Sequence, residues 1–262
     1  AGTGVYMLSV GALAGALGRE NNTYAGLADI QVGENNQVDA TEAIRITADS
    51  HNGNKMLLGG SSFLGTLGGA AAGGLITNTN TFGTTEAPTG ARIGIGQGSA
   101  FELDNGLASG GEFVVSAEHD MSLVAGTSVE NGSAAAGVDI ETQLASSNRA
   151  NIDLVGASLT NRSGDIVLAT HTQGPATNRA TGRVVRGLGV MNVDATTQVE
   201  ADNRITLSDT QVLGRDVRVY AGLRASGLKY NLDAEARSNG FLLALAGGIS
   251  PDAEAHIVER ND

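Results

Sequence analysis

The chain has 262 residues, of which 38 are glycine and 3 are proline, and it contains neither cysteine nor tryptophan. Hydrophobic residues make up 41% and aromatic residues only 3%, so a core has to be built from Val, Ile, Leu and Ala. The net charge of −12 argues against nucleic acid as a partner, because neutralising phosphates needs a Lys/Arg surface, and the missing cysteines exclude disulfides and thiolate metal sites.

Four similar stretches follow one another along the chain. Each has a strand with alternating apolar residues, a polar turn, and a second alternating strand that ends near alanine, which is the two-residue period of a half-buried strand. We expect these alternating residues to anchor ladders in a shared core. In chain order the predicted anchors are Ile30, Val32, Ile44 and Ile46; Ile93, Ile95, Phe113 and Val115; Ile152, Leu154, Ile166 and Leu168; and Ile205, Leu207, Val217 and Val219.

The spacing of these anchors predicts a solenoid. Ile30, Ile93, Ile152 and Ile205 are 63, 59 and 53 residues apart. One coil of a parallel β-helix takes about 18–25 residues, so each repeat is expected to hold two or three coils. The predicted fold is an all-β, right-handed parallel β-helix. It would form one continuous segment of a longer protein or filament, with repeats at residues 28–90, 91–150, 151–202 and 203–262.

Blocks rich in Gly, Ala and other apolar residues separate the paired strands and are interpreted as strand insertions. Residues 56–77 carry no charge over 22 positions, long enough for a membrane-spanning helix. Comparable blocks recur in every repeat, which favours close-packed strands joined by glycine turns, and we expect no membrane span. The blocks cover residues 4–18, 56–76, 133–138, 184–193 and 241–249.

The sequence suggests two kinds of cation site, one for a transition metal at histidines and one for Ca²⁺ at acidic turns. His51, His119 and His171 each follow the alanine that ends a second strand, and a row of them with Asp49 and Asp120 could bind a transition metal. Solvent-facing turn residues explain the same pattern equally well, so no metal or cofactor site is assigned. Weak binding of Ca²⁺ is the remaining expectation, since acidic residues are scattered through the turns. They are Asp29, Glu34, Asp104, Glu118, Asp120, Asp165, Asp209 and Asp216.

Catalysis is the main alternative class of function. Parallel β-helices also host enzymes that act on polysaccharides, which gather carboxylates or Asp, Arg and Lys in a groove. No carboxylate pair departs from the repeat here, and Lys55 and Lys229 are the only lysines. We therefore expect no catalytic residues, and keep a carbohydrate-active enzyme and a calcium-organised matrix protein as alternatives.

The repeats resemble those of large secreted bacterial adhesins of the filamentous-haemagglutinin and leukotoxin-type class. The resemblance rests on the Ile-x-Ile-x-Ala ending, as in residues 44–48, and on the apolar Gly-Gly block before Ala-x-Ala in residues 241–255. It implies a secreted, cell-surface protein that acts as a filament subunit, shaft or adhesin repeat. End-to-end or lateral self-association is expected from open strand edges, and a host, cell-surface or polysaccharide ligand is compatible with this role.

Overall fold

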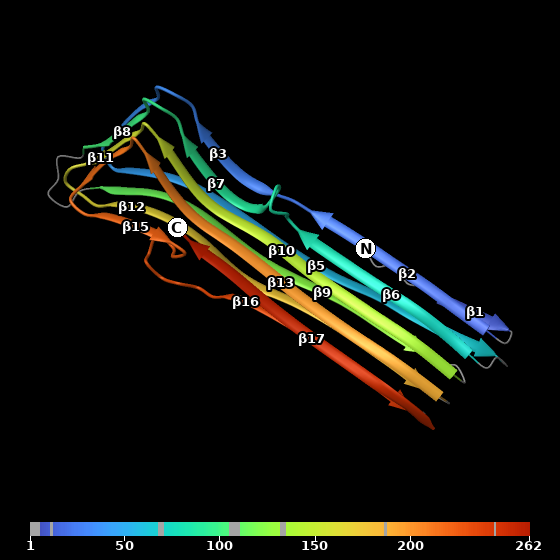
Figure 1. Ribbon diagram of the computed structural model, residues 1–262. Helices are drawn as coiled ribbons and strands as arrows, with labels where there is room; N and C mark the ends of the chain where they lie inside the picture. Colours follow the sequence, from blue (N-terminus) through green and yellow to red (C-terminus); the bar gives the residue numbers. More distant parts are fainter. Residues whose placement is uncertain are drawn as a thin grey trace.

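The structure is a computed structural model that describes residues 6–10, 13–67, 71–104, 111–131, 135–185, 188–243 and 245–262. Within these residues the chain forms β-strands and no helix, and every strand pairing is parallel. The strands build two long sheets that lie side by side along an elongated body, and a third sheet of short strands at one end of it (Figure 1). The expected all-β, parallel architecture is confirmed.

Each sheet collects strands from successive parts of the chain. Sheet A contains, in spatial order, β1 (Tyr6–Val10), β5 (Ala43–Leu67), β9 (Glu112–Asn131), β12 (Ile166–Val185) and β15 (Val217–Ala221), and β16 (Leu232–Leu243) also pairs with β12. Sheet B contains β17 (Ala246–Asn261), β13 (Leu188–Ser208), β10 (Ala135–Val155), β6 (Ala71–Phe82) and β2 (Leu13–Tyr24), with β7 (Thr89–Ile95) on β10 and β3 (Leu27–Val32) on β7. Sheet C contains β14 (Gln211–Gly214), β11 (Ser158–Asn161), β8 (Ala100–Leu103) and β4 (Gln37–Ala40).

The chain visits sheets B, C and A in the same order each time, and we call one such pass a circuit. The predicted anchors of successive repeats are direct neighbours. Ile30 pairs with Ile93, Ile93 with Ile152, and Ile152 with Ile205. Each repeat therefore forms one circuit, and the expectation of two or three coils per repeat was wrong.

The length of the strands explains this difference. Strands β9, β10, β12 and β13 each run for 20 or 21 residues, or about 70 Å at 3.3 Å per residue. Two such strands and the short strand of sheet C together contain most of the residues of one repeat. The circuits are consequently long and narrow, as Figure 1 shows.

The other predicted anchors also form lateral rows. The rows are Val32, Ile95, Leu154 and Leu207; Ile44, Phe113, Ile166 and Val217; and Ile46, Val115, Leu168 and Val219. Anchors of the two middle circuits are buried. Leu207, Val217 and Val219 are 43–49% exposed, because the last circuit has a neighbour on one side only. Ile30, Val32, Ile46 and Ile205 are partly buried against the same cluster.

The interior alternates between aliphatic clusters and polar belts along the length of the strands. Buried hydrophobic clusters lie near sheet C, in the middle and toward the far end. Strand β10 crosses all of them with every second side chain, which are Val138, Ile140, Thr142, Leu144, Ser146, Asn148, Ala150, Ile152 and Leu154. Two sets of buried polar residues separate the clusters. We call Asn78, Asn80, Thr127, Thr142, Asn178 and Thr197 the asparagine belt, and Thr89, His119, Ser146, Asn148, Thr172 and Asn203 the histidine belt.

The asparagine belt ties sheet A to sheet B. Asn178 on β12 donates from Nδ2 to the backbone oxygens of Thr142 and Thr196, both at 2.9 Å, and its Oδ1 accepts from the Thr142 hydroxyl at 3.0 Å. Asn78 on β6 donates to the Thr127 hydroxyl on β9 at 3.1 Å. Buried polar groups are costly when unpaired, so these bonds favour one alignment of the two sheets over a slipped one.

The five Gly/Ala-rich blocks all contribute to the same end of the molecule. Each spans a connection from sheet A to sheet B, namely β1 to β2, β5 to β6, β9 to β10, β12 to β13 and β16 to β17. Parts of these blocks, including residues 11–12, 68–70 and 133–134, lie outside the described residues. The described parts belong to the strands on either side of each connection.

Replacing Ile152 with alanine tests the stacked core. Ile152 is fully buried in the middle of its row. We expect Ile152→Ala to lower the free energy of unfolding by about 2–5 kcal/mol, through lost burial and a residual cavity. Val155, also on β10, is 49% exposed, and Val155→Ala should cost below about 0.5 kcal/mol. Urea unfolding of both variants measures this, and equal costs would contradict the register.

Candidate functional site: a groove on the outer face of sheet A

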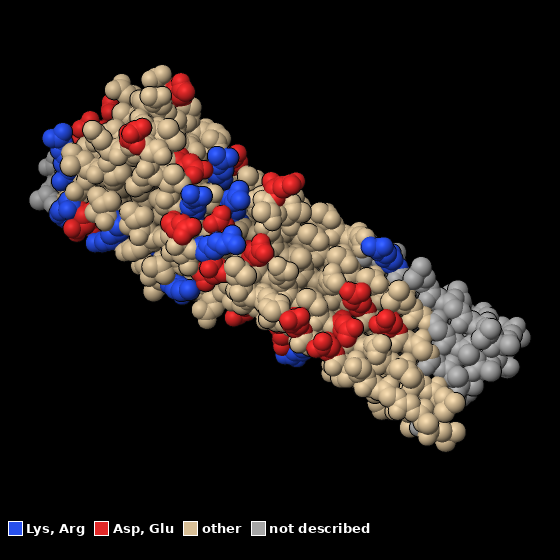
Figure 2. Space-filling model, in the orientation of Figure 1, with Lys and Arg blue, Asp and Glu red and all other residues tan. Residues whose placement is uncertain are grey.

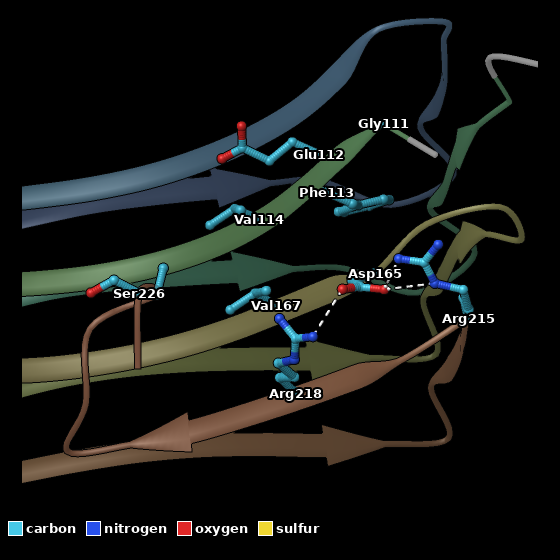
Figure 3. A pocket seen from close by; sticks show the side chains of 10 residues that line it. Gly111, Glu112, Phe113, Val114, Asp165, Val167, Arg215, Arg218 and Ser226 are labelled. Carbon is cyan, nitrogen blue, oxygen red and sulfur yellow. Dashed lines mark hydrogen bonds and ion pairs between the residues drawn. The ribbon is translucent and has the colours of Figure 1, made fainter. Parts of the chain in front are cut away.

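A groove of about 560 Å³ lies on the outer face of sheet A (Figure 3). Its lining comes from three circuits. One circuit contributes the start of β9. The next contributes the start of β12 and the turn before it, and the last contributes β15 with the turn and the segment on either side of it. The lining residues are Gly111, Glu112, Phe113, Val114, Asp165, Val167, Arg215, Arg218, Ala225 and Ser226.

The floor of the groove is a short apolar strip between arginines. Val114 and Val167 are lateral neighbours, Arg45 pairs with Val114 on one side, and Arg218 pairs with Val167 on the other. The four positions span three strand spacings, or about 14 Å between the outer Cα atoms. The arginines stand at the two ends of this row because the parallel register brings one residue from each circuit to the same level.

Ion pairs hold the charged side chains of the groove. Arg215 donates from Nε and Nη2 to one oxygen of Asp165, at 3.2 and 2.9 Å, and Arg218 Nη2 lies 3.0 Å from the other oxygen (Figure 3). Arg218 also approaches Asp216 at 3.8 Å. Glu112 pairs with Arg45. One carboxylate thus serves two guanidinium groups, and both arginines remain about half exposed.

The segment of residues 222–231, between β15 and β16, folds back over sheet A beside the groove. Arg224 in this segment lies 3.4 Å from Glu118 and 3.1 Å from Asp120, which are both on β9. Its guanidinium carbon also lies 4.8 Å from the ring centroid of Tyr230. Since β12 separates β9 from β15, Arg224 links the fourth circuit to the second. We call this contact the arginine clasp.

The arginine clasp compensates an unfavourable cluster of carboxylates. Partial burial raises the pKa of Glu118 above its ordinary value, and the nearby charges of Asp49 and Asp120 raise it further. Arg224 acts in the opposite direction and stabilises the ionised form. If Arg224 were removed, the carboxylates of Glu118 and Asp120 would lie together in a partly buried site with no arginine to balance their charge.

Arg224→Ala is therefore expected to destabilise the protein by about 1–2 kcal/mol, between the values typical of exposed and buried ion pairs. The matched control is Arg237→Ala. Arg237 is more exposed and pairs with Glu235 on the same strand, so its loss should cost below about 0.5 kcal/mol. Urea unfolding compares the two variants. An Arg224→Ala cost no greater than the Arg237→Ala cost would show that the clasp contributes nothing.

The histidines do not form the row considered as a metal site. His119 pairs with Ser50 and Thr172, and His171 pairs with Glu118. His51 is exposed and lies 3.5 Å from Asp120, whereas His119 and His171 are buried. Across the described ranges no group of three or more His, Cys, Asp or Glu side chains is placed to hold a metal ion.

His119 belongs to the histidine belt. Its Nε2 lies 3.2 Å from Asn148 Oδ1, which also accepts hydroxyl hydrogen bonds from Thr89 at 2.9 Å and Ser146 at 3.0 Å. Burial lowers the pKa of His119, and the contact with Asn148 and the charge of Asp120 oppose this only in part. The folded protein thus favours a neutral imidazole at this position.

This environment predicts a pH dependence of stability. Because the pKa of His119 is lower in the folded chain than its ordinary value of 6.5, the unfolded chain binds more protons as the pH falls below 6.5. The free energy of unfolding should drop from this pH downward, until the folded-state pKa is reached. Burial also lowers the pKa of His171, so His119→Gln should reduce this drop without abolishing it, whereas His256→Gln, at an exposed histidine, should leave it unchanged. Urea unfolding between pH 7 and 5 measures both, and an equal slope in the two variants would refute the assignment.

A row of like charges lies on the outer face of sheet B. Glu141, Asp194 and Asp252 are neighbours in register. Burial raises the pKa of Asp194 above its ordinary value, and the charges of Asp139, Asp252 and Glu141 raise it further. Figure 2 shows acidic side chains over the visible face, including a group of them in the half of the molecule away from sheet C. Since each of these carboxylates disfavours the ionised form of Asp194, the row is a repulsive feature of the surface.

Sequence reasoning missed most of the groove. Asp165 was noted as an acidic turn residue, but Glu112, Arg215 and Arg218 were not singled out. One feature of the sequence could have indicated the groove, namely an acidic residue directly before the same anchor in three repeats. The pairs are Glu112 and Phe113, Asp165 and Ile166, and Asp216 and Val217. That signal becomes interpretable only when each repeat is known to form one circuit.

Comparison with known proteins finds no matching protein family, curated protein or solved structure. The part of the chain that the structure describes contains no helix long and apolar enough to cross a membrane.

Proposed function

We propose that the chain is a segment of a right-handed β-solenoid that serves an extracellular structural or adhesive role, as a filament subunit, shaft or surface adhesin repeat. The observation that carries the proposal is the in-register stack of similar circuits, in which each repeat pairs along its length with the next. Further circuits would lengthen such a stack along the stacking direction, in which the ladder hydrogen bonds and the side-chain rows both run.

Self-association follows from the two faces at the ends of the stack. Within the described residues, β2, β3 and β4 pair on one side only, and so do β14, β15 and β17 at the opposite face. Unpaired strand edges tend to join other strands. The second face also exposes Leu207, Leu213, Val217 and Val219 by 43–50%, so further strands there would bury apolar surface.

Sequence character supports a location outside the cell. The repeats resemble those of secreted filamentous adhesins through their Ile-x-Ile-x-Ala endings. A non-catalytic role is part of the proposal.

The groove bears on the alternative of a carbohydrate-active enzyme, because it does hold two carboxylates, Glu112 and Asp165. Both are held in ion pairs with arginine, so the salt bridges that shape the groove already occupy them. A glycoside hydrolase uses its two carboxyl groups on the sugar itself. The arrangement therefore favours a binding role over catalysis.

Sedimentation velocity with negative-stain electron microscopy tests the assembly. We expect the chain to form larger particles as its concentration rises, and Val219→Lys to reduce them by placing a charge on the exposed face. Val155→Lys is the control, because Val155 is equally exposed at 49% but lies on β10 inside sheet B. Melting curves check that both variants fold. A wild-type chain that stays monomeric at high concentration, or a folded Val219→Lys variant that assembles like wild type, would count against the proposal.

A further inference from the structure

We propose that the groove on sheet A binds an acidic oligosaccharide built from uronic acid units, with Arg215 and Arg218 holding a sugar carboxylate. This inference rests on the proposed adhesive function and names the class of ligand. It starts from the charge distribution at Asp165. Two guanidinium groups share that carboxylate, and the next one, Asp216, approaches Arg218 only at 3.8 Å.

Arginine suits a second carboxylate at this site. A guanidinium group carries five N–H donors. Arg218 uses Nη2 in its contacts with Asp165 and Asp216, and its side chain is 47% exposed. An incoming carboxylate can add to Arg218 or exchange with Asp165. The chain as a whole is strongly negative, and Glu112, Asp165 and Asp216 balance the arginines of the groove. An acidic ligand would therefore bind by taking the place of one of these carboxylates on a guanidinium group.

The shape of the groove fits a short sugar chain. Val114 and Val167 provide an uncharged floor between Arg45 and Arg218, and the outer Cα atoms of this row are about 14 Å apart. That distance accommodates several pyranose rings. The Ser226 hydroxyl and the Glu112 carboxylate line the same groove and can bond to sugar hydroxyls.

The backbone of the floor disfavours an acidic peptide. An extended peptide would gain most of its affinity by pairing with a free strand edge. The floor strands have none, because β9 pairs with both β5 and β12, and β12 pairs with β9 on one side and with β15 on the other. Strand β15 keeps a free edge, but on the side away from β12 and the floor. The floor therefore offers side chains to a ligand, which suits a rigid molecule rich in hydroxyl and carboxyl groups.

The experiment is an NMR or calorimetric titration of the full chain with a short galacturonic acid oligosaccharide. We expect saturable binding, no binding of a neutral glucose oligosaccharide, and a loss of affinity of roughly tenfold or more in the double variant Arg215→Ala/Arg218→Ala, because charge-assisted hydrogen bonds are removed. Arg237→Ala, which removes an exposed arginine outside the groove, should leave the affinity unchanged.

Asp165→Asn gives a test with the opposite sign. It frees both arginines from their internal partner, so the affinity for the galacturonic acid oligosaccharide should rise by roughly threefold or more. A purely structural role of the cluster predicts no such gain. Melting curves confirm that each variant is folded.

Several outcomes would overturn the inference. They are absent binding, binding unaffected by the double variant, unchanged or weaker binding in Asp165→Asn, and a poly-glutamate peptide that binds at least as tightly through the same arginines. Assembly is measured separately by sedimentation. Arginine-dependent sugar binding by a chain that does not assemble would support the groove and contradict the structural role, and the reverse result would do the opposite.

Discussion

The structure depends on one constraint, the direct alignment of equivalent residues in neighbouring circuits. Parallel ladders place Ile30, Ile93, Ile152 and Ile205 in one row, and each buried aliphatic side chain contributes about 1.5–3 kcal/mol. A circuit on its own would expose its apolar face, so stability grows as circuits are added. The same constraint explains why side chains of the final circuit, such as Val219, remain exposed although they occupy core positions.

Alignment also organises the polar part of the molecule. Aliphatic rows alone would tolerate a slip of two residues, because a two-residue shift keeps every side chain on the same face. The asparagine and histidine belts penalise such a slip, since it would place Asn178 or Asn148 against Leu or Val side chains and leave buried amides unpaired. On the outer face, the same rows bring Arg45, Val114, Val167 and Arg218 to one level. The groove thus results from the stacking of the circuits. The arginine clasp is a separate contact, made by the segment that follows β15.

The parallel β-architecture could be predicted from the sequence, but the length of the strands and the number of coils in each repeat could not. Aliphatic alternation around Ile30 and Ile44 indicated parallel strands and gave the spacing of equivalent positions. The long strands were missed because their inward-facing residues include Asn, Thr, Ser and His, which resemble turn residues in a sequence. Asn178 is buried in the middle of a 20-residue strand. The groove could not be assembled from the sequence either, because its walls come from three circuits whose register was needed first. The histidine row failed for a related reason, since Ala117 aligns with Thr170 and not with Ala169.

Disulfide trapping tests the alignment most directly, because the native chain has no cysteine. On the outer face of sheet C, Thr160 is a neighbour of Leu213 and of Glu102, and Glu102 is a neighbour of Asp39. Neighbouring strands lie about 4.8 Å apart, within the range of about 4.4–6.8 Å between Cα atoms that a disulfide bridges. The account predicts that Thr160→Cys/Leu213→Cys oxidises to an intramolecular disulfide, whereas Asp39→Cys/Thr160→Cys, separated by one circuit, does not. If the first pair stays reduced, or if both pairs close equally well, the repeats do not stack one circuit at a time.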